Sequence, residues 1–214
     1  MESNERTDIF IDSQSRPFPG YLEELEKEAL AAEVPIIRKD SQRLLRFLMS
    51  LVNPSSILEI GTAVGFSSLL MAEYTKDECH IDTIENFEPR ICEARKNFAK
   101  YDEKGRITLK EGDAGEIIAG LEGEYDVIFL DGPKGQYEAY LDDLLRLLKN
   151  GGLLITDNIL KEGEILESRY AVTRRNRTIH SRMRKYLQRL KEEERLENVI
   201  LPTGDGMTLS VKKY

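Results

Sequence analysis

The chain has 214 residues, of which 40% are hydrophobic and 33% charged, and its formal net charge at pH 7 is −8. This length and balance are typical of one soluble globular domain with a sizeable core. No apolar run approaches the roughly 20 residues needed to span a bilayer, and the first residues lack the layout of a secretory signal. The two cysteines, Cys79 and Cys92, are not spaced as a metal knuckle. We therefore expect a cytoplasmic protein with reduced thiols and no membrane contact.

The charge is unevenly distributed along the chain. Nine of the 31 Lys and Arg residues, and no Asp or Glu, lie between residues 168 and 191. A basic segment on an acidic body suits contact with a polyanion. The same pattern is compatible with a solvated helix face that balances the acidic body, or with salt bridges to a second subunit.

The first 52 residues predict a helical cap. Residues 1–19 have little periodicity, and the prolines and glycine within 16–20 break any helix. Helical periodicity follows over 21–32 and 39–51, and the apolar segment 34–37 lies between the two helices. We predict that this cap (1–52) and a main domain (53–214) form one globular unit.

From residue 53 onward, strand and helix patterns alternate. Strands are predicted at 57–60, 80–85, 107–110, 125–130 and 153–156, with helices at 66–74, 89–101, 114–121 and 137–148. A basic amphipathic helix around 179–190 then precedes a β-hairpin at 199–201 and 207–211. This order predicts an α/β fold with a doubly wound, mainly parallel seven-stranded sheet and a C-terminal antiparallel hairpin.

The segment 57–67 is an apolar run, a glycine-punctuated turn and the start of a helix. Gly61 and Gly65 allow the backbone to turn tightly and to approach a ligand. The helix that follows offers free N–H groups to an anion. The spacing is G-x-x-x-G, which differs from the G-x-G-x-x-G of dinucleotide-binding dehydrogenases.

Polar residues follow the carboxyl ends of the five predicted parallel strands, where ligands bind in such sheets. An acid at the position of Glu85 usually binds ribose hydroxyls. A single acid of this kind is more often a helix cap, and Asp113 is a candidate N-cap. Six such residues together predict a ligand site: Glu59, Glu85, Asp113, Asp131, Asp157 and Asn158.

Asp131, Asp157 and Asn158 form a second constellation within this set. Two carboxylates and an amide oxygen suit Mg²⁺, Ca²⁺ or Mn²⁺ and argue against zinc. A metal there can lower the pKa of a bound hydroxyl. Lys134, three residues after Asp131, is a candidate base next to such a metal, or simply a surface lysine.

Four motifs resemble the metal-dependent O-methyltransferase family that includes catechol and caffeoyl-coenzyme A methyltransferases. They are LEIGTAVGFS at 58–67, GDA at 112–114, DGPK at 131–134 and TDN at 156–158, and the resemblance covers about residues 34–214. It implies a Rossmann-like methyltransferase fold, S-adenosylmethionine (SAM) as cofactor, Mg²⁺ or another hard divalent cation, and a homodimer.

The resemblance also implies a role for each site residue. The cofactor would contact Ile37, Glu59, Gly61, Gly65, Ser67, Glu85, Asp113, Ala114 and Asp131. The metal ligands would be Asp131, Asp157 and Asn158, and the catalytic residues Lys134 and Asp131.

Within this family the chain is similar to bacterial tRNA 5-hydroxyuridine methyltransferases, which make 5-methoxyuridine at the wobble position. The likeness rests on VPII at 34–37, the arginine-rich segment and PTGDG at 202–206. It implies a tRNA anticodon loop as partner, bound by Arg174, Arg175, Arg177 and Arg182. Arg182 and Arg189 would share a helix face opposite the apolar stripe and contact phosphates.

Two other functions are compatible with the sequence. A small-molecule O-methyltransferase would act on catechols or related vicinal oxygen pairs with the same metal site. A non-enzymatic nucleotide-binding or RNA-binding module ranks last, because it has no need for the cluster of Asp131, Asp157 and Asn158.

Overall fold

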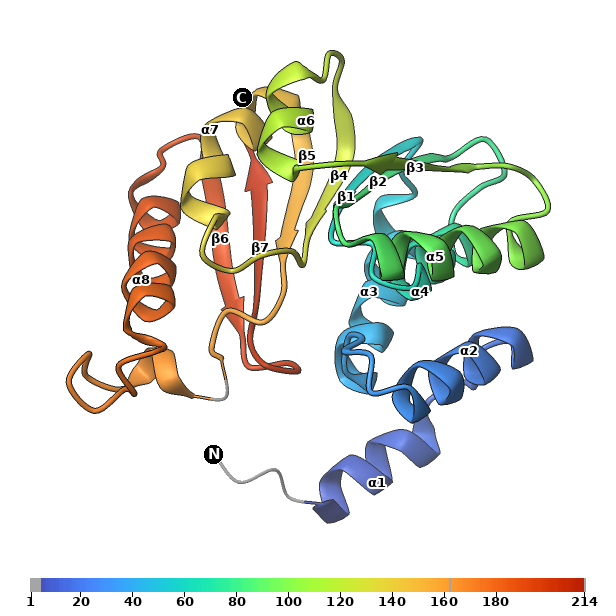
Figure 1. The fold of residues 1–214 in the computed structure, drawn as a ribbon, viewed down its shortest axis with the longest axis horizontal. Coiled ribbons are helices and arrows are strands. Elements are labelled where there is room, and N and C mark those ends of the chain that lie inside the picture. The colour runs from blue at the N-terminus through green and yellow to red at the C-terminus, as the bar shows by residue number, and fades with distance from the viewer. Residues whose placement is uncertain (1–4, 162, 214) are drawn as a thin grey trace.

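A computed structural model describes residues 5–161 and 163–213, and these residues contain one seven-stranded sheet (Figure 1). The strands are β1 Ser56–Ile60, β2 His80–Glu85, β3 Ile107–Glu111, β4 Tyr125–Leu130, β5 Leu148–Thr156, β6 Leu196–Leu201 and β7 Met207–Lys212. Their order in the sheet is β3-β2-β1-β4-β5-β7-β6. Strands β1 to β5 run parallel, and β7 is antiparallel to both β5 and β6. The predicted doubly wound sheet with a closing hairpin is confirmed.

Helices cover both faces of this sheet. They are α1 Glu5–Gln14, α2 Gly20–Ala31, α3 Lys39–Val52, α4 Phe66–Glu73, α5 Glu88–Tyr101, α6 Ala114–Gly120, α7 Tyr137–Leu147 and α8 Arg177–Glu192, with a short 3₁₀ turn, η1, at Glu164–Leu166. All but α1 and η1 follow the predicted ranges to within two residues. Amphipathic periodicity located helices such as α3, α7 and α8 because each buries one face, whereas α4 is buried on nearly all sides.

Neighbouring residues of each central strand belong to different cores, because successive side chains of a strand point to opposite faces. Ile57, Val127 and Ile155 pack in a cluster with α2, α3 and α4. Leu58 and Ile128 pack in the other, with α6, α7 and α8. Strands buried on both faces read as continuous apolar runs, as the sequence shows.

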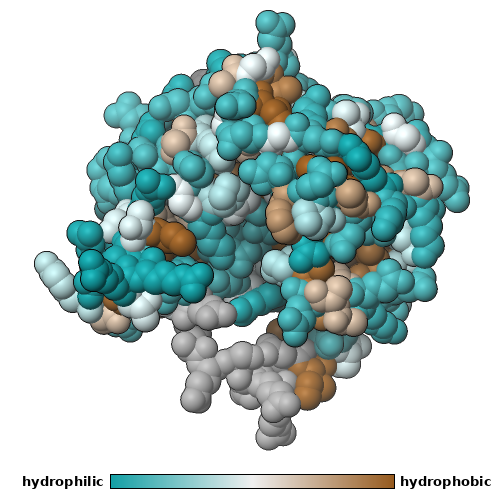
Figure 2. All heavy atoms as spheres, in the orientation of Figure 1, coloured by the Kyte–Doolittle hydropathy of each residue, from teal (hydrophilic) through white to brown (hydrophobic). Residues whose placement is uncertain are grey.

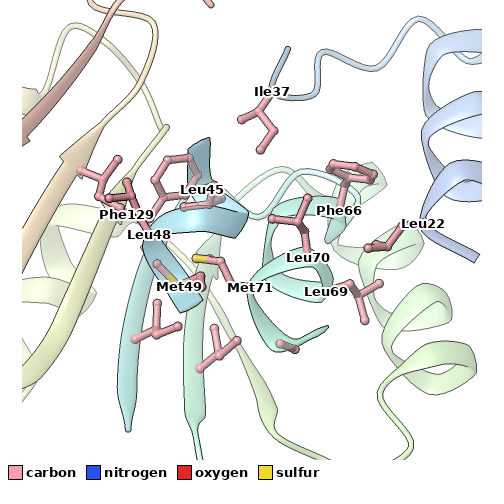
Figure 3. Close-up of a cluster of buried hydrophobic side chains, with 14 of the residues drawn as sticks. Leu22, Ile37, Leu45, Leu48, Met49, Phe66, Leu69, Leu70, Met71 and Phe129 are labelled. Carbon is pink, nitrogen blue, oxygen red and sulfur yellow. The ribbon is translucent and has the colours of Figure 1, made fainter. Parts of the chain in front are cut away.

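The N-terminal helices α2 and α3 belong to the first of these cores (Figure 3). Leu22 of α2 and Leu45 of α3 are buried in the same cluster as Phe66 of α4 and Phe129 of β4. At the surface, the guanidinium of Arg46 lies 4.7 Å from the centre of the Tyr74 ring. The cap and the main domain therefore share one hydrophobic core.

Helix α1 lies in a region where the sequence predicted no helix. Its apolar residues Ile9, Phe10 and Ile11 are exposed, and the side chain of Asp12 forms an ion pair with Arg43 of α3. A helix that buries no apolar face carries no amphipathic signal, which explains why periodicity missed it.

Strand β5 is longer than predicted, because it begins at Leu148, directly where α7 ends. Leu148 pairs with Tyr125, and the register then shifts so that Leu153 pairs with Val127. Lys149 to Gly152 lie in the interrupted part, and Gly151 adopts φ +77°. The glycine pair at 151–152 thus lies at an irregularity within the strand.

The surface seen in Figure 2 is largely hydrophilic, with apolar side chains in small, separate groups. Among the described residues, no helix combines the length and the apolarity that a bilayer crossing requires. Both cysteines are free thiols: Cys79 is buried and Cys92 exposed.

Candidate active site

The glycine loop after β1 is shaped by two positions that exclude any side chain. At Gly61, φ is +103° and an added Cβ would lie 2.3 Å from the carbonyl oxygen of Asp131. At Gly65, φ is +84° and a Cβ would lie 2.5 Å from the Phe98 ring. Gly65 directly precedes α4, so the N-terminus of that helix begins at the loop. Glycine is required at both positions because the conformation and the space each exclude a larger residue.

The loop is supported from below by a buried carboxylate. Glu59 is fully buried and accepts hydrogen bonds from the hydroxyls of Ser67, Ser68 and Thr83. Thr83 is also hydrogen bonded to Thr62, 2.6 Å between the hydroxyl oxygens. Burial raises the pKa of Glu59, and the three hydroxyl donors oppose that rise. The carboxylate thus links β1, β2 and the first turn of α4.

A cavity of about 550 Å³ lies above the loop, where the strand order reverses between β1 and β4. This is the topological switch point at which ligands bind in open α/β sheets. Nine of the predicted site residues line the cavity: Ile37, Gly61, Ser67, Glu85, Asp113, Ala114, Asp131, Lys134 and Asn158. Glu59, Gly65 and Asp157 are not part of its wall. We therefore assign Glu59 and Gly65 to support of the loop.

Two acids on the cavity wall are fixed by backbone N–H groups. Glu85 accepts from Ala63 at 2.9 Å, and from Asn86 and Phe87 at 3.0 Å. Asp113 is the N-cap of α6, because its side chain accepts from the N–H groups of Gly115 and Glu116 at 2.8 and 3.2 Å. The N-cap alternative for Asp113 is confirmed, and the same residue lines the cavity.

At one end of the cavity, the structure brings Asp131, Asp157 and Asn158 together. The amide nitrogen of Asn158 lies 3.1 Å from Oδ1 of Asp131 and 3.2 Å from Oδ2 of Asp157. Asn158 adopts a left-handed conformation, with φ +59°. Asparagine tolerates this conformation better than most residues do, which fits its place at the sharp turn after β5.

Asp131 and Asp157 have pKa values that are unusual for aspartates. Burial and the neighbouring Asp157 raise the pKa of Asp131, and burial likewise raises the pKa of Asp157. The Lys134 ammonium opposes both shifts, so it lies near both carboxylates. Oδ1 of Asp157 is buried and has no hydrogen-bond partner among the described residues. A buried, unsatisfied carboxylate oxygen is costly unless a cation or a donor binds it.

The donor set suits a hard divalent cation. In the described part of the chain, no three His, Cys, Asp or Glu side chains are grouped so that they could hold a metal, so an amide would be the third ligand here. Exchanging the oxygen and nitrogen of the Asn158 amide would place an oxygen between the two carboxylates. Three oxygen ligands then match the preference of Mg²⁺, Ca²⁺ or Mn²⁺.

Several arginines of the basic segment form intramolecular contacts, although Arg182 and Arg184 of α8 are also exposed. Arg182 donates to the carbonyl of Gly135 at 3.1 Å, and Arg177 to that of Val172 at 3.2 Å. Arg189 forms an ion pair with Asp142 of α7 at 2.7 Å. Arg174 and Arg175 are exposed.

The sequence did not single out several residues of the site. Tyr140 lines the cavity beside Asp113 and Gly115, and Ser68 and Thr83 bind Glu59. Tyr140 has the helical spacing of core residues, so no local signal separated it from them. Ser68 and Thr83 are recognisable only once β1, β2 and α4 are packed together.

The buried aspartate pair predicts a pH-dependent stability. Because the folded-state pKa of Asp157 is raised, the folded protein holds a proton that the unfolded chain releases above pH about 4. In the presence of EDTA, the unfolding free energy should fall as the pH rises from about 4 toward neutrality. Asp157→Asn should therefore stabilise the EDTA-treated protein more at pH 8 than at pH 4, as measured by urea denaturation. Glu103→Gln, at an exposed position, is the control. An equal effect of Asp157→Asn at both pH values would contradict the prediction.

Comparisons with known proteins agree with this geometry. A family model described as O-methyltransferase matches residues 12–213. The chain is 32% identical over 180 residues to the caffeoyl-CoA O-methyltransferase 1 of Eucalyptus globulus, covering 79% of this chain and 72% of that protein. It is 31% identical over 163 residues to the catechol O-methyltransferase of Mycobacterium tuberculosis, covering 74% of each.

Solved structures show the same likeness over the whole fold. A methyltransferase of Podospora anserina, bound to S-adenosylhomocysteine (SAH), superposes with a TM-score of 0.86 at 28% identity, covering 100% of this chain and 98% of that one. The family model and this structure match nearly the whole chain, and the matched part includes the glycine loop and the cavity at the switch point. The chain belongs to the O-methyltransferase family of the caffeoyl-CoA and catechol type, and it is a SAM-dependent O-methyltransferase.

Proposed function

We propose that this enzyme transfers the methyl group of SAM to one oxygen of a vicinal oxygen pair, with the help of a divalent metal ion. The observation that carries the proposal is the group formed by Asp131, Asp157 and Asn158 at the end of the cavity, with the unpartnered Oδ1 of Asp157. Lys134 lies on the same cavity wall. Oxygen ligands and a nearby ammonium are the elements that metal-assisted deprotonation of a hydroxyl requires.

In this proposal, the cofactor lies along the wall from the glycine loop to α6. The loop from Gly61 to Ser67 would hold the methionine part, Glu85 would accept hydrogen bonds from the ribose hydroxyls, and Asp113 and Ala114 would lie beside the adenine; all of these except Val64 and Gly65 line the cavity. Glu85 is already fixed by three N–H groups, so it presents its oxygens without a loss of side-chain freedom. The sulfonium carries an activated methyl group, and what the protein supplies is alignment with the acceptor oxygen.

Asp131, Asp157 and Asn158 would hold the metal, which would supply a lowered pKa to an acceptor hydroxyl and an orientation for two adjacent oxygens. Lys134 is the candidate base that removes the hydroxyl proton. The negative charges of Asp131 and Asp157 lie near its ammonium.

A catechol-type small molecule is the acceptor that we favour. Catechol and caffeoyl-CoA O-methyltransferases are among the relatives, at 31% and 32% identity. A vicinal diol on an aromatic ring gives a metal site of this kind the two adjacent oxygens that it can orient. The apolar residues Ile36, Ile37 and Pro133 of the cavity wall provide surface for an aromatic ring.

Methylation of 5-hydroxyuridine in a tRNA anticodon loop is the second candidate. Its O5 hydroxyl and O4 carbonyl form an equivalent oxygen pair. The specific observation that favours it is the turn before α8, where Arg169, Arg174 and Arg175 are exposed. No hydrogen bond or ion pair engages these three arginines within the described residues. Exposed arginines in the segment that follows the candidate metal ligands are suited to phosphates.

The loop geometry predicts the effect of one added methyl group. Gly61→Ala should weaken SAH binding by at least about tenfold, because the Cβ collides with the Asp131 carbonyl and the left-handed backbone is strained. Isothermal titration calorimetry with SAH measures this. Gly20→Ala, where no atom lies within 4 Å of the added Cβ, is the matched control. Wild-type affinity in Gly61→Ala would contradict the placement of the cofactor over the loop.

The proposed chemistry is tested with SAM, Mg²⁺ and a panel of catechols. We expect methylated product from the wild-type enzyme. We expect background levels after addition of EDTA, which removes the metal, and in Asp157→Ala, which removes one of its ligands. Circular dichroism verifies that the variant is folded. Turnover that survives both EDTA and Asp157→Ala would rule out the metal-dependent mechanism.

The second candidate is tested by replacing the catechols of the assay with a tRNA that carries 5-hydroxyuridine. If this tRNA is the acceptor, the double variant Arg174→Ala, Arg175→Ala should bind it more weakly. The logarithm of its association constant should also fall less steeply with the logarithm of the salt concentration, by about two units of slope. Arg195→Ala, an exposed arginine that pairs with Glu193, is the control. Catechol turnover combined with no salt-dependent tRNA binding would eliminate the tRNA substrate.

A further inference from the structure

Two fully buried tyrosines lie behind the candidate metal ligands, and neither belongs to the cavity wall. Tyr137 is the first residue of α7 and Tyr186 lies in α8. Their rings pack edge to face, with centroids 5.6 Å apart and an angle of 70° between the ring planes. Both hydroxyls point to the ends of the strands that carry the ligands.

Each tyrosine hydroxyl bonds to the residue next to one of the two aspartates. The hydroxyl of Tyr137 donates to the carbonyl oxygen of Gly132, which follows Asp131, at 3.2 Å. The hydroxyl of Tyr186 lies 2.6 Å from Oγ1 of Thr156, the last residue of β5, which precedes Asp157. The packed rings therefore connect the end of β4 to the end of β5 through side chains.

Backbone pairing between β4 and β5 ends just before the two aspartates. The ladder between β4 and β5 ends at the pair Leu130 and Thr156, and one further bond joins the N–H of Asp157 to the carbonyl of Leu130 at 3.1 Å. Beyond that point each segment is held by its other neighbour: the N–H of Asp131 donates to the carbonyl of Ile60 at 2.9 Å, and the N–H of Ile159 to the carbonyl of Gly206 at 3.0 Å. Among the described residues, no backbone hydrogen bond past Asp157 joins these two segments to each other, so side chains are needed to tie the two carboxylates together.

We propose that Tyr137 and Tyr186 are positioning residues that set the separation of Asp131 and Asp157 and thereby the affinity for the metal. The inference rests on the proposed metal site. Packing against a second buried ring leaves each tyrosine little rotational freedom, so each hydroxyl holds one strand end in a fixed place. Arg182, which also extends from α8, holds the same Asp131 loop further along, at Gly135.

The test uses Mn²⁺ as the probe and measures its dissociation constant by electron paramagnetic resonance, without SAM or acceptor. Tyr186→Phe and Tyr137→Phe each remove one hydroxyl and keep the packed ring. We expect Mn²⁺ binding to weaken by about tenfold in each, the lower end of what loss of a residue supporting metal ligands costs. Thermal unfolding of each variant is recorded alongside.

Tyr125→Phe is the matched control. Tyr125 is also buried, and its hydroxyl donates to Asp82 at 2.6 Å, but it begins β4 at the end opposite Asp131. Tyr125→Phe should lower the thermal stability and leave the Mn²⁺ affinity unchanged. A general loss of packing would instead weaken Mn²⁺ binding in all three variants to an extent that follows their stability, which would overturn the proposal.

Two further variants distinguish an error in the positioning role from an error in the proposed metal site. Asp157→Ala should abolish Mn²⁺ binding; if the wild-type protein does not bind Mn²⁺, or Asp157→Ala binds it equally well, the proposed function is wrong. If those two results are as expected but Tyr186→Phe binds Mn²⁺ with wild-type affinity, the positioning role is wrong. Thr156→Val removes the partner of Tyr186, and combining it with Tyr186→Phe should weaken binding no further than either change alone.

Discussion

The approach of Gly61 to Asp131 is the constraint on which the site depends. The N–H of Asp131 donates to the carbonyl of Ile60 at 2.9 Å, and its own carbonyl lies where a Cβ of residue 61 would be. The glycine loop and the loop of the candidate metal ligands are thereby in direct contact at the switch point. In an enzyme that transfers a methyl group from one ligand to another, this contact brings donor and acceptor sites together.

The site concentrates negative charge in a protein whose net charge is already −8. Burying carboxylates is unfavourable unless hydrogen bonds or opposite charges compensate. The carboxylate of Glu59 receives three hydroxyl hydrogen bonds and so is internally compensated. Asp157 lacks such compensation at Oδ1. This difference fits a supporting role for Glu59 and a cation-binding role for Asp157.

Helix α8 has two separate sets of residues. Its arginines suggested a surface for phosphates, but Arg182 and Arg189 contact the loop after β4 and the acids of α7. Its buried face contributes Tyr186 to the region behind the candidate metal ligands. The helix thus belongs to the framework of the site. Arg182 and Arg184 on it are exposed but hydrogen bonded, whereas the exposed arginines of the preceding turn form no hydrogen bond or ion pair within the described residues.

The sequence by itself determined the order and type of nearly every element. The alternation of apolar runs and amphipathic helices is a local property, and it is strong wherever an element is buried. It failed at α1, which exposes its apolar residues, and at β5, where two glycines lie inside a strand. The carboxyl ends of the strands also located the cavity residues, because all parallel strands end at one edge of the sheet.

Tertiary structure decided which of those residues face the cavity and which support it. Glu59 and Glu85 both lie at the carboxyl end of a strand, yet Glu59 is buried and bound by three hydroxyls, whereas Glu85 lines the cavity. The roles of Thr83, Tyr137 and Tyr186 depend on contacts between segments far apart in the chain. No local pattern encodes such contacts, because they arise only when the sheet and its two helical layers are packed together.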